Sequence, residues 1–113
     1  MESKTEGVRS GEFLVSEANG TRSRESVTIT GGSFPAGQVL GMITASKKYT
    51  AYASGATDGS ENAAAVLYGA TDASTADQSA VAIVRDAEIS EELAADIDAA
   101  AIIELSTKGI ITR

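Results

Sequence analysis

The fold is decided by a continuous apolar run, Ala80-Val81-Ala82-Ile83-Val84, which leads into Arg85-Asp86-Ala87-Glu88-Ile89. A run of this length that is rich in β-branched residues predicts a strand. A second run of the same kind, Ala64-Ala65-Val66-Leu67-Tyr68, precedes it across a polar loop at Thr71–Asp77. Together the two runs predict a β-rich core in the second half of the chain.

Shorter strand patterns lie upstream, each bounded by glycine or other turn residues. They are Glu12–Ser16, Ser26–Thr30, Val39–Thr44 and Tyr49–Tyr52. Asn19-Gly20 and Asp58-Gly59 are favoured turn pairs, and Pro35-Ala36-Gly37 predicts another turn. Many short strands separated by turns favour a small barrel or a sandwich.

Helical signals are confined to the end of the chain. Ser90 is a candidate N-cap ahead of two glutamates, whose charges suit the positive end of a helix dipole. Gly109 is placed to end the helix, and Asp96 is a second candidate cap within the span. The pattern predicts either one helix or two short ones, over residues 90–95 and 97–108. The fold class is therefore mainly β with a short C-terminal helical segment.

The 113 residues have room for one domain with one ordinary hydrophobic core. Aromatic residues make up only 4% of the chain, so Ala, Val, Ile and Leu must supply most of the buried area. Residues 1–11 are polar and lack periodicity, which is typical of a disordered segment. We expect a flexible N-terminal arm at residues 1–25 and a β-rich domain at residues 26–113.

Composition excludes several classes of function. The chain has no cysteine and no histidine, so disulfides, thiolate metal sites and Ser-His-Asp or Cys-His catalysis are ruled out. A net charge of −7 is the wrong sign for neutralising phosphates, and nucleic acid is not an expected partner. No run approaches the roughly 18 apolar residues of a membrane span, and no signal-peptide pattern is present. We expect synthesis in the cytoplasm of the host cell and no membrane partner.

Two groups of residues have side chains that could in principle take part in catalysis or metal binding. Ser46 lies next to Lys47 and Lys48, but a lysine acts as a base only when burial lowers its pKa, and this segment is a polar turn. The second group is an acidic set that could bind calcium or serve in acid–base chemistry: Asp86, Glu88, Glu91 and Glu92. A strand end followed by the first turn of a helix explains that set better. We therefore expect no catalytic site, no metal and no cofactor.

The order of these motifs resembles the head decoration proteins of tailed bacteriophages, a family typified by the lambda head protein D. The similarity is carried by segments that cover most of the chain: Phe34–Gly41, Tyr49–Tyr52, Ala56–Ser60, Ala63–Tyr68, Ala80–Ile89 and Gly109–Arg113. Each segment is short, and their order along the chain makes the resemblance specific. The resemblance implies a β-clip type of fold.

The resemblance also implies a function. It suggests a cement protein that binds the outer surface of the expanded head as homotrimers and stabilises the shell against the pressure of the packaged DNA. The partner would be the major capsid protein, contacted by the N-terminal arm through the edge of a sheet. The arm residues expected to make this contact are Glu12, Phe13, Leu14, Val15, Ser16, Arg22 and Arg24.

Two alternatives remain open from the residues themselves. The Phe13–Val15 segment could instead form a strand within its own domain. The Pro35–Gly41 segment is also similar to small β-modules that bind a ligand or another protein, although no obvious aromatic platform for a ligand accompanies it.

Overall fold

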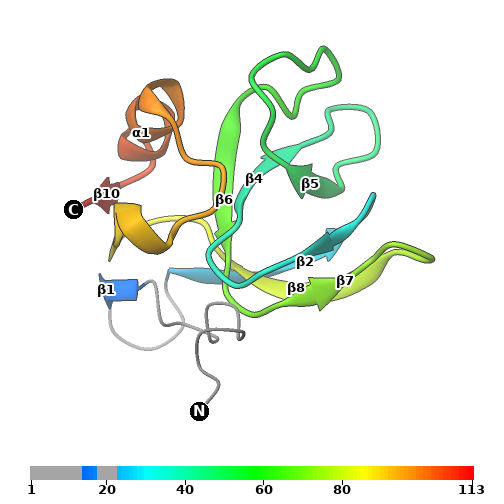
Figure 1. The fold of residues 1–113 in the computed structure, drawn as a ribbon, viewed down its shortest axis with the longest axis horizontal. Coiled ribbons are helices and arrows are strands. Elements are labelled where there is room, and N and C mark those ends of the chain that lie inside the picture. Colours follow the sequence, from blue (N-terminus) through cyan, green and yellow to red (C-terminus); the bar gives the residue numbers. More distant parts are fainter. Residues whose placement is uncertain (1–13, 18–22) are drawn as a thin grey trace.

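The computed structural model describes residues 14–17 and 23–113 and shows a closed β-barrel with a small sheet and a helix packed against one side (Figure 1). The elements in chain order are β1 (Leu14–Glu17), β2 (Arg24–Ile29), β3 (Ser33–Phe34), β4 (Val39–Met42), β5 (Tyr49–Ala51), β6 (Ala63–Leu67), β7 (Thr71–Asp72), β8 (Gln78–Ile83), β9 (Ala87–Ile89), the 3-10 helix η2 (Glu91–Leu93), α1 (Ala99–Ser106) and β10 (Ile110–Thr112).

The barrel has the strand order β2-β5-β4-β6-β8. Its longest ladder joins β2 and β8 in antiparallel register, from Arg24 opposite Ile83 to Ile29 opposite Gln78. A parallel contact between Ile29 and Tyr49 closes the barrel. Alternate residues of each strand point inward, and they fill the lumen with a compact apolar cluster: Val27, Ile29, Leu40, Ala65, Leu67, Ala73 and Ala82.

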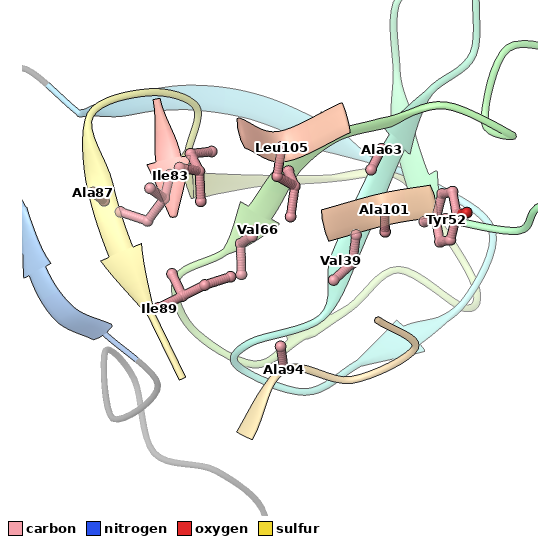
Figure 2. Packing of buried hydrophobic residues seen from close by; sticks show 11 residues of the cluster. Val39, Tyr52, Ala63, Val66, Ile83, Ala87, Ile89, Ala94, Ala101 and Leu105 are labelled. Carbon is pink, nitrogen blue, oxygen red and sulfur yellow. The ribbon is translucent and has the colours of Figure 1, made fainter. Parts of the chain in front are cut away.

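A second core lies between the outer wall of the barrel and the C-terminal elements (Figure 2). On the barrel, its buried members come from β4, β6, β8 and the residue that follows β5. On the other side, they come from β9, the segment from η2 to α1, and β10. They are Val39, Tyr52, Ala63, Val66, Ile83, Ala87, Ile89, Ala94, Ala101, Leu105 and Ile110. Neighbouring residues such as Val66 and Leu67 therefore enter different cores. Burial on both faces explains why β6 reads as a continuous apolar run. In β8, only Ala82 and Ile83 are fully buried, and Val81 is exposed.

The helical segment divides into two pieces, and the predicted caps need correction. Ser90 precedes η2, but its side chain makes no capping hydrogen bond. The cap of α1 is Asp98, whose carboxylate accepts a hydrogen bond from the Ala101 backbone N–H at 2.8 Å, so Asp96 is not the cap. Asp96 instead accepts a hydrogen bond from the buried Gln38 side chain at 2.8 Å. Gly109 follows the helix with a φ of +81°, as predicted for a residue that ends it.

Four strands, β3, β7, β9 and β10, were missed or only partly anticipated. Thr71–Asp72 was predicted as loop, yet it forms β7 and pairs with β3. Residues 87–89 form a full strand, β9, and residues 110–112 form β10, which runs parallel to it. Strands this short depend on a partner that is distant in the sequence, so local pattern carries little signal for them.

The architecture confirms the prediction of a single, mainly β domain with a short C-terminal helical segment. The predicted barrel is present as the closed five-stranded unit. Among the described residues, no helix has the length and hydrophobicity that crossing a bilayer would require.

Candidate functional site

Three of the predicted arm residues, Leu14, Val15 and Ser16, lie on one edge of the small sheet, where the order is β1-β9-β10. Leu14 lies opposite Ile89 and Glu17 lies opposite Ala87, in antiparallel register. The register shifts between Leu14 and Ser16, which marks a β-bulge. Because β1 is the end strand, no other described strand uses its second backbone edge, and such an edge is a template for pairing with another chain.

The structure describes part of the predicted arm. Leu14, Val15 and Ser16 lie in β1, so Leu14–Glu17 takes the alternative of a strand within its own domain. The half-buried Leu14 packs against the second core. The other predicted arm positions, Glu12, Phe13 and Arg22, lie outside the described residues.

Arg24 begins β2 and stands apart from β1. Its guanidinium carbon lies 4.3 Å from the centre of the Tyr68 ring, a cation–π geometry. Tyr68 in turn packs against the second core. Arg24 also lines a shallow groove of about 220 Å³ with Glu25, Ser26 and Val81.

Ion pairs flank this side of the molecule. Arg85 contacts Glu25 at 2.5 Å, and Arg113 contacts Glu88 at 2.7 Å. The hydrogen bond and the charge of Glu88 raise the pKa of Arg113 above its usual value, so this guanidinium stays charged. Exposed pairs of this kind contribute little to stability. Their main effect is to place charges of both signs around the edge of the sheet.

A second, larger groove of about 410 Å³ lies where β9 and β10 end. Ser90, Glu91, Glu92, Ile97 and Arg113 line it. Two backbone hydrogen bonds set its geometry: the Arg113 N–H donates to Ile89, and the Glu91 N–H donates to the Arg113 carbonyl. The groove therefore combines a cation, two exposed carboxylates and a partly buried isoleucine that belongs to the second core.

The sequence did not single out this groove, because its residues come from three separate elements. The β-branched triplet Ile110-Ile111-Thr112 after Gly109 was the one local signal that could have revealed β10. Without β10, the position of Arg113 beside Ile89 could not be inferred.

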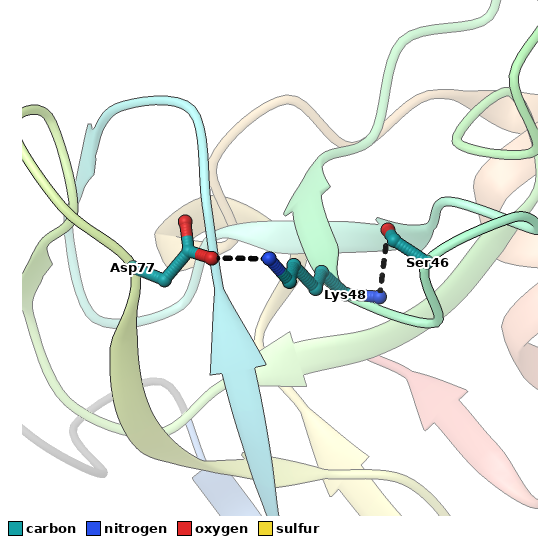
Figure 3. A network of polar contacts seen from close by, with 3 residues as sticks. All are labelled: Ser46, Lys48 and Asp77. Carbon is teal, nitrogen blue, oxygen red and sulfur yellow. Dashed lines mark hydrogen bonds and ion pairs between the residues drawn. The ribbon is translucent and has the colours of Figure 1, made fainter.

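The lysine segment that was considered for catalysis has a structural role. The Lys48 amine lies 2.5 Å from a carboxylate oxygen of Asp77. Figure 3 shows that it is directed away from the Ser46 hydroxyl. The Ser46 hydroxyl oxygen accepts a hydrogen bond from the Lys48 backbone N–H at 3.3 Å. The Lys48 hydrogen bond is the largest of the effects that lower the pKa of Asp77. This arrangement links two loops and offers Ser46 no amine base.

The acidic set is dispersed as well. Glu88 contacts Arg113, whereas Glu91 and Glu92 project into the groove. Within residues 14–17 and 23–113, no three carboxylates gather in a way that could hold a metal ion.

The comparisons with known proteins point to a family. The family model described as bacteriophage lambda head decoration protein D matches residues 3–110, nearly the whole chain. No curated protein matches the chain significantly.

Proposed function

Because the chain belongs to the family of bacteriophage lambda head decoration protein D, whose role is decoration of the phage capsid, we propose that it binds the outer surface of the expanded head as a homotrimer. The bound trimers stabilise the shell against the pressure of the packaged DNA. The protein is made in the host cytoplasm and is carried on the virion. The family match over residues 3–110 is the observation that carries this proposal.

The architecture suits a mechanical role. Two cores lie back to back across the barrel wall, so the body has few parts that can move independently. The Asp98 and Glu104 carboxylates fasten α1 to the barrel through Tyr52 and the Ala63 backbone N–H, at 2.9 Å and 2.7 Å. A rigid body of this kind can transmit load from one capsid contact to another.

The capsid contact is proposed to involve residues 1–25, acting as an arm on the domain formed by residues 26–113. The end position of β1 supports pairing between the arm region and a strand of the major capsid protein, a recognised mode of protein association. The apolar Phe13, Leu14 and Val15 and the basic Arg22 and Arg24 would supply side-chain contacts.

We expect one arm to bind the capsid weakly and the three arms of a trimer to bind it tightly together. Ordering an arm costs about 1–2 kcal/mol for each residue that becomes fixed. Three arms on one trimer convert the second and third contacts into intramolecular events, which can raise the overall affinity by about 10²–10⁴. A trimer is therefore part of the proposed mechanism.

The test is sedimentation with purified expanded heads, combined with light scattering of the free protein. The structure improves the choice of truncation, because removing residues 1–24 would also delete β1 and the first residue of β2. A Δ1–13 variant keeps both strands and should remain trimeric, at three times the mass of its own shortened chain, while losing head binding.

The outcomes distinguish a capsid-binding protein from a ligand-binding β-module. Full retention of head binding by Δ1–13 would remove residues 1–13 from the contact, and the Δ1–24 variant would then ask whether β1 carries it. A monomer that ignores heads and binds a small ligand would support the β-module alternative instead. Stabilisation is measured as DNA release on heating, which decorated heads should resist to a higher temperature than bare heads.

A further inference from the structure

The outer side of the β2–β8 ladder is an exposed surface without charge. The buried residues of β2, and Ala82 of β8, fill the barrel lumen, so the residues that alternate with them point outward. The exposed outward residues are Ser26, Thr28, Ser79 and Val81. Ser26 lies opposite Val81 and Thr28 lies opposite Ser79, so the four form one patch, called here the β2–β8 face.

This face has the composition of a protein–protein contact. One end of it is hollowed by the groove of about 220 Å³ that Arg24, Glu25, Ser26 and Val81 line. Arg24 is already held over the Tyr68 ring at 4.3 Å, so a partner that covers it has less side-chain freedom to remove. Arginine and tyrosine are enriched among the residues that carry binding energy. A centre without charge and a polar rim are typical of such interfaces.

Ion pairs border the β2–β8 face at both ends of the ladder. At one end, Arg85 contacts Glu25 at 2.5 Å. At the other end, Lys48 contacts Asp77, the residue before β8, at 2.5 Å. With Arg24 included, this rim has three positive and two negative side chains, whereas the whole chain has a net charge of −7. The acidic excess of the molecule therefore lies outside the face and its rim.

We propose that copies of this chain contact one another through the β2–β8 face in the trimer. The inference rests on the proposed function, which requires a trimer, and it names the surface that holds the trimer together. The occupant is a second copy because its charge fits: acidic molecules repel one another, and the repulsion is weakest where negative charge is scarce. The rim also carries both signs, so Glu25 of one copy can pair with Arg24 of the next. A ring of three repeats one such contact three times.

The location keeps this contact apart from the proposed capsid contact. Figure 1 shows β2 and β8 running side by side to the right of β1 and β10. No strand of the small sheet β1-β9-β10 contributes a residue to the face. The outer edge of β1 therefore stays available to a capsid strand when the trimer has formed.

The first test compares two substitutions at equally exposed sites. Val81 and Ile111 are both 39% exposed, β-branched and located in strands, but Ile111 lies in β10, outside the face. Light scattering over a dilution series gives the concentration at which half of the trimers have dissociated. We expect Val81→Glu to raise this concentration at least about tenfold, because a carboxylate buried without a partner is costly, and Ile111→Glu to raise it less than about threefold. Far-UV circular dichroism checks that both variants are folded.

Thiol labelling tests the same face without adding a charge. The chain has no cysteine, so one introduced thiol is the only one present. Ser79→Cys places it in the face, and Ser106→Cys, at an exposed position of α1, is the matched control. Each labelling rate is divided by the rate of the same variant in urea. In the trimer, we expect Ser79→Cys to react at least about fivefold more slowly than Ser106→Cys, and Val81→Glu to abolish the difference at a concentration where it is monomeric.

A trimer that withstands Val81→Glu, or one that Ile111→Glu weakens equally, would overturn the assignment of this face and leave the proposed function standing. Equal labelling of Ser79→Cys and Ser106→Cys would overturn it too. Protection of Ser79→Cys that persists in the monomer would show that the chain covers its own face. A Val81→Glu trimer that no longer binds heads would show that the capsid covers it, and either result refutes the proposal. An unsubstituted chain that is monomeric would remove the homotrimer from the proposed function as well.

Discussion

Replacing Asp98 with alanine should be one of the most damaging single changes at the surface of this protein. Asp98 is exposed, yet its carboxylate caps α1 through the Ala101 backbone N–H at 2.8 Å. It also accepts the hydrogen bond of the Tyr52 hydroxyl at 2.9 Å. Tyr52 is only 4% exposed and belongs to the second core, so its hydroxyl group has little access to water.

The magnitude follows from these two contacts. Loss of an N-cap side chain typically costs about 0.5–2 kcal/mol. Leaving a buried hydroxyl without a partner costs about 1–3 kcal/mol. We therefore expect Asp98→Ala to lower the free energy of unfolding by about 2–4 kcal/mol, a drop in Tm of about 8–16 °C for a domain of this size.

The assay is thermal and urea unfolding followed by far-UV circular dichroism, at one fixed protein concentration because association affects apparent stability. Glu92→Ala, another exposed acid in the same region, is the control and should change stability by less than about 0.5 kcal/mol. Tyr52→Phe and the double variant complete a cycle whose coupling energy should be about 1 kcal/mol. A loss below 1 kcal/mol for Asp98→Ala, or additive effects in the cycle, would refute the reasoning.

Three further outcomes are expected. Burial first, and then the hydrogen bond to Asp98, raise the pKa of Tyr52 from 10.0 to about 12, so stability should be complete below pH 10 and fall as the pH rises toward 12. The loss is at most about 2.7 kcal/mol before solvent screening reduces it, and alkaline titration of Tyr52→Phe should lack it; identical profiles would contradict this assignment. Leu105→Ala should cost about 2–5 kcal/mol in urea unfolding because Leu105 is fully buried, whereas Ile103→Ala at a 66% exposed position of the same helix should be nearly neutral, and similar losses would argue against the packing described. Gly41→Ala should fail to give soluble protein, because the added Cβ would lie 2.4 Å from the Ser60 carbonyl oxygen; a variant of wild-type Tm would disprove that close approach.

The sequence was sufficient to predict which segments form the longer strands. Val27 and Ile29 alternate with polar residues in β2, whereas β6 and the last four residues of β8 are apolar, so period and composition identify these strands. The helical end was predicted as one or two helices, and its division into η2 and α1 agrees with the second option. The choice of Asp98 over Asp96 as cap was not predictable, because both carry the same side chain and only the path of the chain separates them.

The candidate site was less accessible to sequence reasoning. Leu14–Glu17 reads as a strand, but its partner could equally be a capsid strand or a strand of its own domain. The structure pairs it with β9 because β9 is itself fixed by β10 on its other side. The groove beside it requires Arg113, Glu91 and Ile97 to come together, and no motif spans them.

The sequence by itself determined the class of the fold, the positions of its longer strands, the lack of cysteine and histidine chemistry and the resemblance to a decoration family. Those properties depend on composition, on periodicity and on the order of short motifs, all of which are local or additive. Only the tertiary structure decided that the barrel wall is buried on both sides at β6, that β1 lies on β9, and that Arg113, Glu91 and Ile97 line one groove. These features arise from pairing between residues far apart in the chain, which depends on how all the elements pack together and is encoded in no single segment.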